Sequence, residues 1–242
     1  MEKTGTALLG AVPVLILEKQ EKPIINGVGH MKRGINVVIQ RLPGYYRYFD
    51  KLHSMEIQGV SSAALSKKIG ISPSLVRKDI CQFGGFGQTA YGYNVKEVRA
   101  KLGHILGVDN LRCAVMIGTG CMGHALLRYV RFDAAGFIVV AAFEKVSGQT
   151  GREISGIPVL NVSELDRVIQ IHRPDIAILT PSDIPVQTMA RQLAKMGIRG
   201  FWNFSGEELA LDEPDCFVEN VDLVESLLQL SYRIAPGGEA IK

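Results

Sequence analysis

Residues 112–144 read RCAVMIGTGCMGHALLRYVRFDAAGFIVVAAFE and hold two short apolar runs with a glycine-rich turn between them. The runs at 113–117 and 137–143 are bounded by glycine or by charge, which predicts strands buried on both faces. The segment that joins them has the length and the apolar pattern of a helix. The stretch therefore predicts a strand–helix–strand unit of a parallel sheet.

Three glycines directly after the first run have the spacing G-x-G-x-x-G, at positions 118, 120 and 123. Bare backbone there can approach a pyrophosphate, and the amides of a helix N-terminus can hold it. Glu144 closes the second run, 21 residues after Gly123. A carboxylate at that place can bind an adenosine ribose and repels a 2′-phosphate, so the unit favours NAD(H) over NADP(H). Glycines of this spacing can also serve helix–sheet packing alone.

The rest of the chain continues the alternation of strands and helices. Strand-like runs at 175–180, 200–204 and 217–221 are separated by helical segments at 162–171 and 184–196. This pattern predicts a doubly wound parallel sheet of the Rossmann type, with its ligand crevice at the carboxyl ends of the strands. The predicted cofactor-binding residues are Gly118, Thr119, Gly120, Cys121, Met122, Gly123, Glu144, Lys145, Thr180, Pro181, Asn203 and Phe204.

The charges divide the chain into a basic and an acidic segment. The formal net charge of +3 hides 12 Lys/Arg against 4 Asp/Glu at 32–101, and 12 against 17 at 102–242. This contrast suggests a nucleic-acid-facing module joined to a second module. With 47% hydrophobic residues, a chain of 242 residues can bury the core of one large domain or of two unequal domains.

The basic segment has the pattern of a helix-turn-helix. Ser61 is suited to cap a helix at 62–69, which Gly70 ends. Ser72 is suited to cap the next helix, with Pro73 in its first turn. Two helices with a tight turn between them predict a DNA-binding motif.

The second of these helices, in SPSLVRKDICQFG at 72–84, has two unlike faces. Val76 and Ile80 share an apolar face with Phe83, while Arg77 and Lys78 lie opposite. The basic face predicts contacts with guanine edges or phosphates in the major groove, and a solvated basic surface is the plainer alternative. The predicted DNA-binding residues are Ser72, Ser74, Arg77, Lys78 and Gln88.

Further elements flank the helix-turn-helix. Apolar residues recur at helical spacing over 37–52, where a Pro-Gly pair at 43–44 predicts two short helices or one broken helix. Glycines and aromatic residues at 84–93 predict a short hairpin, which makes the module winged. An amphipathic helix at 95–106 and a linker at 107–110 follow.

The four cysteines show no C-x-x-C motif and no metal-ligand spacing. We therefore expect neither a metal site nor a disulfide framework, and a reducing cytosol fits this usage. Cys121 lies inside the glycine motif, where it either packs or carries a thiol whose oxidation blocks the nucleotide.

Residues 1–35 have no regular pattern, and we expect a disordered leader, or no translation of this part if synthesis begins at Met31. The apolar run at 7–17 is too short to span a membrane, and no small-x-small cleavage site follows it. We therefore expect a cytoplasmic protein without a membrane partner.

Ten short segments match one protein family in order and spacing. They are RLPGYYRYF, SSAALSKKIGISPSLVRKDI, FGGFG, GYNV, GTGCMG, VVAAFE, GIPV, AILT, GIRGFWNF and VENVDL. Over residues 38–234 the chain closely resembles the Rex family of bacterial redox-sensing transcriptional repressors. The resemblance implies a winged helix-turn-helix domain joined to a Rossmann domain, with a C-terminal helix that swaps into the partner subunit of a homodimer.

The resemblance also implies a mechanism. Such a protein binds operator DNA with NAD⁺ or no ligand and releases it when NADH binds, and it turns over no substrate. By position, Arg47, Tyr129 and Asp222 match a polar set that couples the nicotinamide to domain orientation. Reduction removes the positive charge of the ring, which changes the partner that a nearby carboxylate or arginine prefers. Each residue also has a simpler alternative role. Arg47 would cover a helix surface, Tyr129 would be packed in the core, and Asp222 would cap the last helix.

The chain departs from the family pattern at the wing and near the ligand. The sequence QTA at 88–90 replaces the usual basic pair, which predicts an altered phosphate or minor-groove contact. Glu144 replaces the more common Asp, Pro-Ser follows AILT at 181–182, and Ser-Gly at 205–206 replaces Ala-Pro. We expect these changes to preserve the fold and to affect the preference between NADH and NAD⁺.

We expect a leader at 1–35, a winged-helix domain at 36–107, a Rossmann domain at 108–220 and a swapped helix with a tail at 221–242. The apolar surface of that helix predicts docking on a partner subunit. One alternative is a DNA-binding dimer whose Rossmann domain is structural or binds another nucleotide, such as a CoA derivative. Another is an NAD-dependent dehydrogenase, but the histidines are scattered without an acid–base constellation, so we expect no catalytic residues.

Overall fold

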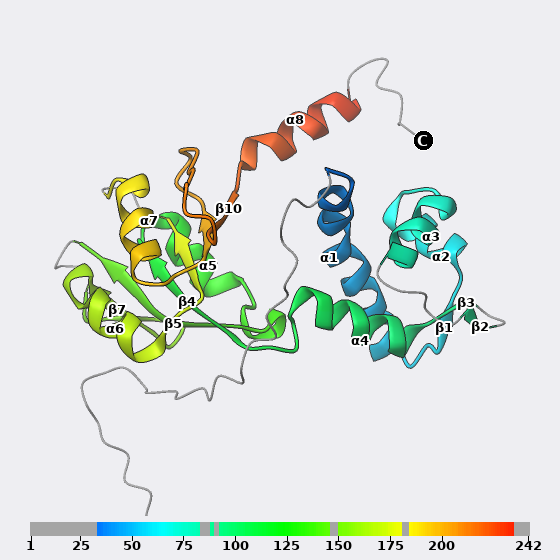
Figure 1. Ribbon diagram of the computed structural model, residues 1–242, viewed down its shortest axis with the longest axis horizontal. Helices are drawn as coiled ribbons and strands as arrows, with labels where there is room; N and C mark the ends of the chain where they lie inside the picture. Colours follow the sequence, from blue (N-terminus) through cyan, green and yellow to red (C-terminus); the bar gives the residue numbers. More distant parts are fainter. Residues whose placement is uncertain (1–32, 83–87, 90–91, 146–149, 181–183, 235–242) are drawn as a thin grey trace, which may run out of the picture. The chain divides into compact units, whose positions relative to one another are not determined.

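The computed structural model describes residues 33–82, 88–89, 92–145, 150–180 and 184–234, with the backbone alone at 33–37 and 88–89. The described residues form two compact units, 33–110 and 111–234, and each is described by itself (Figure 1). We call them the N-terminal unit and the C-terminal unit. Most of the leader expected at 1–35 lies outside the described residues. Within the described parts, no helix is long and apolar enough to cross a membrane.

The N-terminal unit is built on one long helix, α1 (Arg33–Ser54). The prediction of two short helices or one broken helix is wrong, because the Pro-Gly pair at 43–44 lies inside this continuous helix. Leu42, Tyr45 and Phe49 recur at intervals of three and four residues and are at most 2% exposed. Their burial offsets the backbone hydrogen bond that proline cannot donate.

Three shorter helices pack with α1 around one core. The predicted helix-turn-helix consists of α2 (Ser62–Ile69) and α3 (Pro73–Gln82), and α4 (Val95–Leu106) packs against α1. The predicted caps of α2 are confirmed, since the Ser61 side chain accepts a hydrogen bond from a backbone N–H of the first turn and Gly70 adopts a φ of +79°. Val76 and Ile80 on the apolar face of α3 are buried in this core.

The N-terminal unit also contains a small antiparallel sheet in the order β1-β3-β2. One of its strands precedes the helix-turn-helix in the chain, and the other two follow it. Its strands are β1 (Gly59–Val60), β2 (Gln88–Thr89) and β3 (Gly92–Asn94). Gly92 has a φ of +107°, and a Cβ atom at this position would collide with the backbone carbonyl of Val60. Only glycine fits at this crossing. The antiparallel pairing of β2 with β3 agrees with the predicted hairpin in the part of it that the structure describes.

The C-terminal unit contains a seven-stranded sheet in the order β10-β9-β8-β4-β5-β7-β6, in which every neighbouring pair is parallel except β6 with β7. Its strands are β4 (Arg112–Ile117), β5 (Phe137–Glu144), β6 (Glu153–Ile154), β7 (Ile157–Asn161), β8 (Ile176–Leu179), β9 (Gly200–Asn203) and β10 (Phe217–Asn220). The five strands expected from apolar runs are confirmed. The sequence patterns do not predict β6 and β7, which are short and joined by a tight turn.

Helices cover both faces of this sheet. The helices α6 (Leu165–His172) and α7 (Val186–Lys195) pack on one face, and α5 (Cys121–Tyr129) packs on the other. Short 3₁₀ turns occupy Asp133–Ala135 and Val162–Glu164. Because β4 lies between β5 and β8, the winding direction reverses at β4. In an open α/β sheet, ligands bind at such a switch point.

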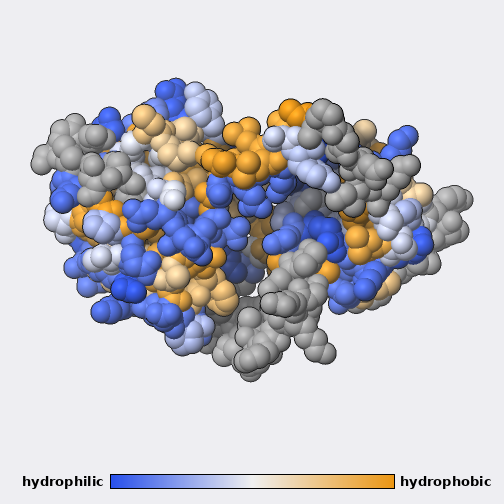
Figure 2. Space-filling view, turned by 90° about the horizontal axis from the view of Figure 1, so that it is seen from above, coloured by the Kyte–Doolittle hydropathy of each residue, from blue (hydrophilic) through white to orange (hydrophobic). Residues whose placement is uncertain are grey.

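The last helix, α8 (Leu223–Ile234), lies within the segment 221–242 expected to hold the swapped helix, and it has no buried residue. Leu227 and Leu228 are 63% and 64% exposed, and Ile234 is 75% exposed. Hydrophobic side chains accordingly appear in orange over α8 in the space-filling view (Figure 2). An apolar helix surface of this size is typical of a segment that packs on another surface.

Candidate nucleotide site and nucleic-acid interface

The glycine loop between β4 and α5 has the geometry of a phosphate cradle. Gly118 adopts a φ of +95°, and Gly120 is the N-cap of α5. A Cβ atom on Gly120 would meet no other atom within 4 Å, so the space over the helix N-terminus is open. The first amides of a helix have no partner within the helix, and the helix dipole favours a negative charge beside them. The loop can therefore hold a pyrophosphate.

The third glycine fixes the helix close to the sheet. A Cβ atom on Gly123 would collide with the carbonyl oxygen of Gly118 and lie 2.7 Å from Thr180 Oγ1. Thr180 follows β8 and is 7% exposed, and its hydroxyl donates a hydrogen bond to Gly118 O at 2.7 Å. The end of β8 is thus bonded to the loop after β4, which brings two of the predicted segments together.

Glu144 ends β5 beside the glycine loop. Its Oε1 accepts a hydrogen bond from the backbone N–H of Thr119 and another from Thr119 Oγ1 at 2.9 Å. Thr119 is 3% exposed, whereas Glu144 is half-buried. A half-buried carboxylate at this strand end can accept hydrogen bonds from ribose hydroxyls. The residues present therefore fit an adenine dinucleotide.

Asn203 and Phe204 come to the same edge of the sheet at the end of β9. The buried Asn203 amide nitrogen donates hydrogen bonds to Glu207 O and to Asn220 Oδ1, both at 2.7 Å, while its Oδ1 accepts from Ser205 N at 3.1 Å. Through these contacts the Asn203 side chain holds the loop at 204–207 in place. The Phe204 ring packs edge-on against Trp202, with ring centroids 4.6 Å apart.

The other predicted cofactor-binding residues lie at the rim of the site. Cys121 and Lys145 are exposed, and Met122 is half-buried. Pro181 lies outside the described residues. The register of the strands aligns the ends of β4, β5, β8 and β9, so the loops after them share one edge.

The three residues expected to couple ligand to DNA belong to different units. Arg47 is exposed on α1 of the N-terminal unit. In the C-terminal unit Tyr129 ends α5 and is 79% exposed, so the alternative of a packed core residue is wrong for this unit. Asp222 Oδ1 accepts hydrogen bonds from Val224 N at 2.7 Å and Glu225 N at 3.3 Å, and therefore caps α8.

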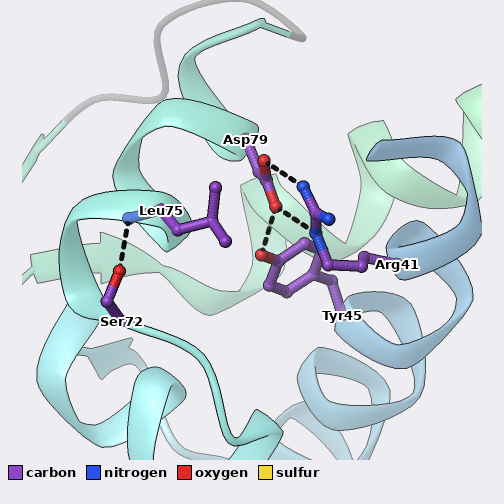
Figure 3. Close-up of polar contacts among 5 residues, drawn as sticks. All are labelled: Arg41, Tyr45, Ser72, Leu75 and Asp79. Carbon is purple, nitrogen blue, oxygen red and sulfur yellow. Dashed lines mark hydrogen bonds and ion pairs between the residues drawn. The ribbon is translucent and has the colours of Figure 1, made fainter. Parts of the chain in front are cut away.

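The predicted DNA-facing residues of α3 lie together at the surface. Ser72 caps α3, because its Oγ accepts a hydrogen bond from Leu75 N at 3.3 Å (Figure 3). The same oxygen lies 3.0 Å from Ser74 Oγ. Arg77 and Lys78 are exposed, and Arg77 Nη1 donates to Ser62 Oγ at 3.0 Å. This contact brings the guanidinium to the N-terminus of α2.

The wing is described only in part. The backbone of Gln88 pairs with Tyr93 across β2 and β3, and the side chain of Gln88 lies outside the described residues. The segments 83–87 and 90–91, which include the apolar Phe83, also lie outside them. The expected change in a phosphate or minor-groove contact of the wing therefore stays a prediction.

The structure adds three residues to which the sequence patterns assign no role. Asp79 of α3 is 1% exposed, and its carboxylate accepts hydrogen bonds from Arg41 and Tyr45 of α1 (Figure 3). Arg41 Nε donates to Oδ2 at 2.7 Å, Arg41 Nη2 donates to Oδ1 at 2.8 Å, and Tyr45 Oη donates to Oδ2 at 2.7 Å. One sequence signal could have found Asp79, since an acid stands on the apolar face of an otherwise basic helix.

The electrostatics of this trio follow from its burial. The hydrogen bond to Asp79 raises the pKa of the Arg41 guanidinium, although burial opposes that shift. Burial, and then the hydrogen bond to Asp79, raise the pKa of Tyr45 well above its usual value. The guanidinium and the phenol therefore remain protonated donors at neutral pH, and the carboxylate has an ionised partner.

Metal-binding groups do not gather in the part of the chain that the structure describes. Within it, no cluster of three or more His, Cys, Asp or Glu side chains could hold an ion. The polar groups of both candidate sites are instead directed to backbone amides, hydroxyls and guanidinium groups.

Comparisons with known proteins match both units. A family described as "Putative DNA-binding protein N-terminus" matches residues 36–81, and one described as "CoA binding domain" matches residues 109–206. The "Redox-sensing transcriptional repressor Rex" of Clostridium beijerinckii is 39% identical over 196 residues, which cover 81% of this chain and 92% of that protein. The protein of the same name from Clostridioides difficile is 40% identical over 200 residues, covering 83% and 95%.

Solved structures agree with these matches. The crystal structure of RSP in complex with beta-NAD+ and operator DNA has a TM-score of 0.76 and 37% identity, covering 82% of this chain and 91% of that chain. The crystal structure of RSP in complex with beta-NADH has a TM-score of 0.74 and 34% identity, covering 82% and 93%. RSP is described as a Rex-family repressor.

Proposed function

The chain belongs to the Rex family of redox-sensing transcriptional repressors, and we propose that it binds operator DNA when NAD⁺ or no ligand is present and releases the DNA when NADH binds. One observation carries this proposal. A single chain combines an exposed basic recognition helix, α3, with a glycine loop whose helix N-terminus is open and is bordered by Glu144.

The proposed cofactor is NAD(H), held at the carboxyl edge of the sheet. The glycine loop at 118–123 would hold the pyrophosphate, and Glu144 with Lys145 would border the adenosine. Thr180, Pro181, Asn203 and Phe204 would border the remaining part, Asn203 through the loop that it positions. Bound coenzyme supplies a ring whose charge changes on reduction, and the protein performs no reaction on it.

A CoA derivative is the second candidate ligand, because residues 109–206 match a family described as a CoA binding domain. Glu144 argues against it. The adenosine of CoA carries a 3′-phosphate on its ribose, and a carboxylate bonded to the glycine loop would repel that phosphate. The free ribose hydroxyls of NAD(H) can instead donate hydrogen bonds to it.

The proposed DNA partner is a duplex read in its major groove. Arg77 and Lys78 would contact base edges or phosphates, Ser72 and Ser74 the backbone, and Gln88 the groove beside the wing. A helix-turn-helix reader of this kind commonly acts as a dimer on two half-sites. The exposed positions of the four α3 residues support this assignment.

We further propose a homodimer in which α8 docks on the partner subunit. The exposed apolar residues of α8 support this proposal. A groove of about 400 Å³ on the sheet face that carries α5 also supports it, because Phe132, Trp202 and Phe217 give it an apolar lining. Arg47, Tyr129 and Asp222 would then couple the oxidation state of the ligand to the way the units pack.

The wider assignments follow from the same proposal. The protein would be a transcription regulator and not an enzyme, and it would act in the cytoplasm. Residues 36–107 would form the DNA-binding domain and residues 108–220 the NAD(H)-binding domain, followed by the swapped helix at 221–242.

Reciprocal binding measurements test the proposal. Fluorescence anisotropy on a pseudo-palindromic, A·T-flanked duplex should show tight binding with NAD⁺ and a loss of affinity with NADH. By linkage, the same duplex must weaken NADH binding by the same factor. Equal NADH affinities with and without the duplex would refute the sensing role, and oxidation of NADH by the purified protein with a candidate substrate would favour an enzyme.

A further inference from the structure

Asp79 fixes α3 to α1 in both position and direction. The two parallel contacts from Arg41 form a fork, which constrains orientation as well as distance. Tyr45 lies one helical turn beyond Arg41 on α1 and supplies a third contact at 2.7 Å. A carboxylate held by two successive turns of one helix can neither slide along that helix nor rotate away from it.

Fixing Asp79 also fixes the rotation of α3 about its own axis. Successive residues of an α-helix are separated by about 100° around the axis. Arg77 and Lys78 immediately precede Asp79 and are exposed, whereas Asp79 is 1% exposed. The buried acid therefore determines which way its two basic neighbours point.

Apolar packing does not account for this arrangement by itself. Val76 and Ile80 already give α3 a buried apolar face, and hydrophobic contacts are not directional. A buried ion pair costs desolvation energy, and an apolar residue of similar volume often stabilises a fold at least as well. A forked ionic contact beside two hydrophobic anchors is better explained by a need for orientation than by a need for stability.

We propose that Asp79, through Arg41 and Tyr45, is a positioning residue that sets the rotation of α3 for reading a DNA sequence. This inference rests on the proposed function. Asp79 itself makes no contact with DNA, and it acts by directing Arg77 and Lys78 toward base edges. A base contact formed by a correctly placed basic side chain discriminates by about 1–3 kcal/mol, or roughly 5- to 150-fold.

Charge and positioning predict effects of opposite sign, which makes the role measurable. Asp79→Asn removes one negative charge beside the DNA surface, and added positive charge strengthens sequence-independent binding. Loss of the fork frees α3 to rotate, which weakens binding to the preferred sequence. The ratio of the two affinities should therefore fall, whereas a purely electrostatic role would raise both affinities together.

The experiment uses the full chain and two duplexes of equal length. One duplex is selected by the wild-type protein from a random pool, and the other is unrelated. Fluorescence anisotropy at fixed salt should show that Asp79→Asn lowers affinity for the selected duplex about tenfold while affinity for the unrelated duplex stays equal or rises slightly. NADH binding should be unchanged.

Asp50→Asn is the matched control. It removes the same charge and breaks another arginine pair of α1, with Arg99 Nε at 2.6 Å on α4, without touching α3. Asp50→Asn should change the affinities for the selected and the unrelated duplex in the same direction. The ratio of the two affinities should stay within about twofold of the wild-type ratio. A ratio that falls as far in Asp50→Asn as in Asp79→Asn would overturn the proposal.

Circular dichroism identifies variants that fail to fold. If Asp79→Asn fails to fold, Tyr45→Phe is the deciding variant, because it deletes one hydroxyl and keeps the buried ring. Loss of a hydrogen bond worth about 1 kcal/mol should lower the ratio by at most roughly fivefold. An unchanged ratio in a folded variant would overturn the positioning role. A wild-type protein that prefers no duplex would instead refute the proposed function, so the two failures are distinguishable.

Discussion

The two units use their acidic side chains in opposite ways. In the N-terminal unit, Asp79 is 1% exposed and accepts three hydrogen bonds from the side chains of another helix. In the C-terminal unit, Glu144 is half-buried and accepts hydrogen bonds from a loop at the ligand edge. The buried acid holds secondary structure in place, whereas the half-buried acid stands where a ligand can reach it.

This contrast shows which contacts orient the functional surface of each unit. The basic face of α3 is oriented by contacts inside the protein, before any DNA is present. The glycine loop is oriented by Glu144 and Thr180 but keeps open space above Gly120. The first unit is therefore built as a rigid reader, and the second as a receptor that a ligand completes.

The largest expected effect is on stability. Asp79→Ala should lower the free energy of unfolding by about 3 kcal/mol, because it leaves the Arg41 charge and the Tyr45 hydroxyl without their shared partner. Glu144→Ala should cost about 1 kcal/mol, because Glu144 itself is half-buried and makes hydrogen bonds only to Thr119. Urea unfolding measures both: Trp202, the single tryptophan, reports the C-terminal unit, and circular dichroism reports both units. Equal losses in the two variants would remove the contrast.

Within the C-terminal unit, two glycine substitutions separate packing from ligand binding. Gly123→Ala should destabilise the unit by about 2 kcal/mol and abolish NADH binding, because its Cβ collides with Gly118 O. Gly120→Ala should leave the melting temperature within about 1 °C, because its Cβ meets no protein atom. It should still weaken NADH binding about tenfold by filling the cradle. NADH titration with thermal unfolding checks both, and a stable Gly123→Ala variant with full affinity would contradict the packing role.

A smaller effect is expected on ligand choice. Glu144→Gln should reduce the preference for NADH over NADPH about tenfold, because the neutral amide no longer repels a 2′-phosphate. Competition titrations with the two coenzymes measure this ratio. Asp79→Asn is the matched control in the other unit and should leave the ratio unchanged. A retained preference in Glu144→Gln would assign the discrimination to another residue.

The smallest expected effect is a pH dependence of the C-terminal unit. Burial lowers the pKa of His172 on α6 from its usual value of 6.5. The unfolded chain then binds a proton more readily than the folded unit, so stability is complete above pH 6.5 and falls as the pH drops toward the lowered value. His172→Gln should flatten this slope. Melting curves at pH 7.5 and 5.5, followed by Trp202 fluorescence, measure how far the melting temperature falls between the two pH values. An equal fall in the variant and in the wild type would show that His172 is not involved.

Much of the C-terminal unit can be predicted from the sequence because its signals are local. Buried parallel strands are continuous apolar runs, and the glycine spacing reports a backbone geometry over six residues. Both signals give the positions of β4, β5, α5 and Glu144 correctly. The strand β6 escapes prediction because two residues carry no periodic signal. Its partner β7 has five residues but contains Pro158, and a proline within a run argues against a strand.

The N-terminal unit is harder to predict because its decisive contacts are distant in sequence. Arg41 and Tyr45 lie 38 and 34 residues before Asp79, and no local pattern links them. Pro43 misleads for a related reason, since local propensity disfavours a helix that long-range burial of Leu42 and Tyr45 nevertheless stabilises.

The enclosure of the Arg41–Asp79 pair has a consequence for behaviour under osmotic stress. Mobile ions screen exposed charges over about 8 Å at physiological ionic strength, but they have little access to a pair whose carboxylate is 1% exposed. Contacts of Lys78 and Arg77 with phosphates would compete directly with the cation atmosphere of the duplex. A surge of potassium should therefore loosen the hold on DNA without changing which sequence is preferred.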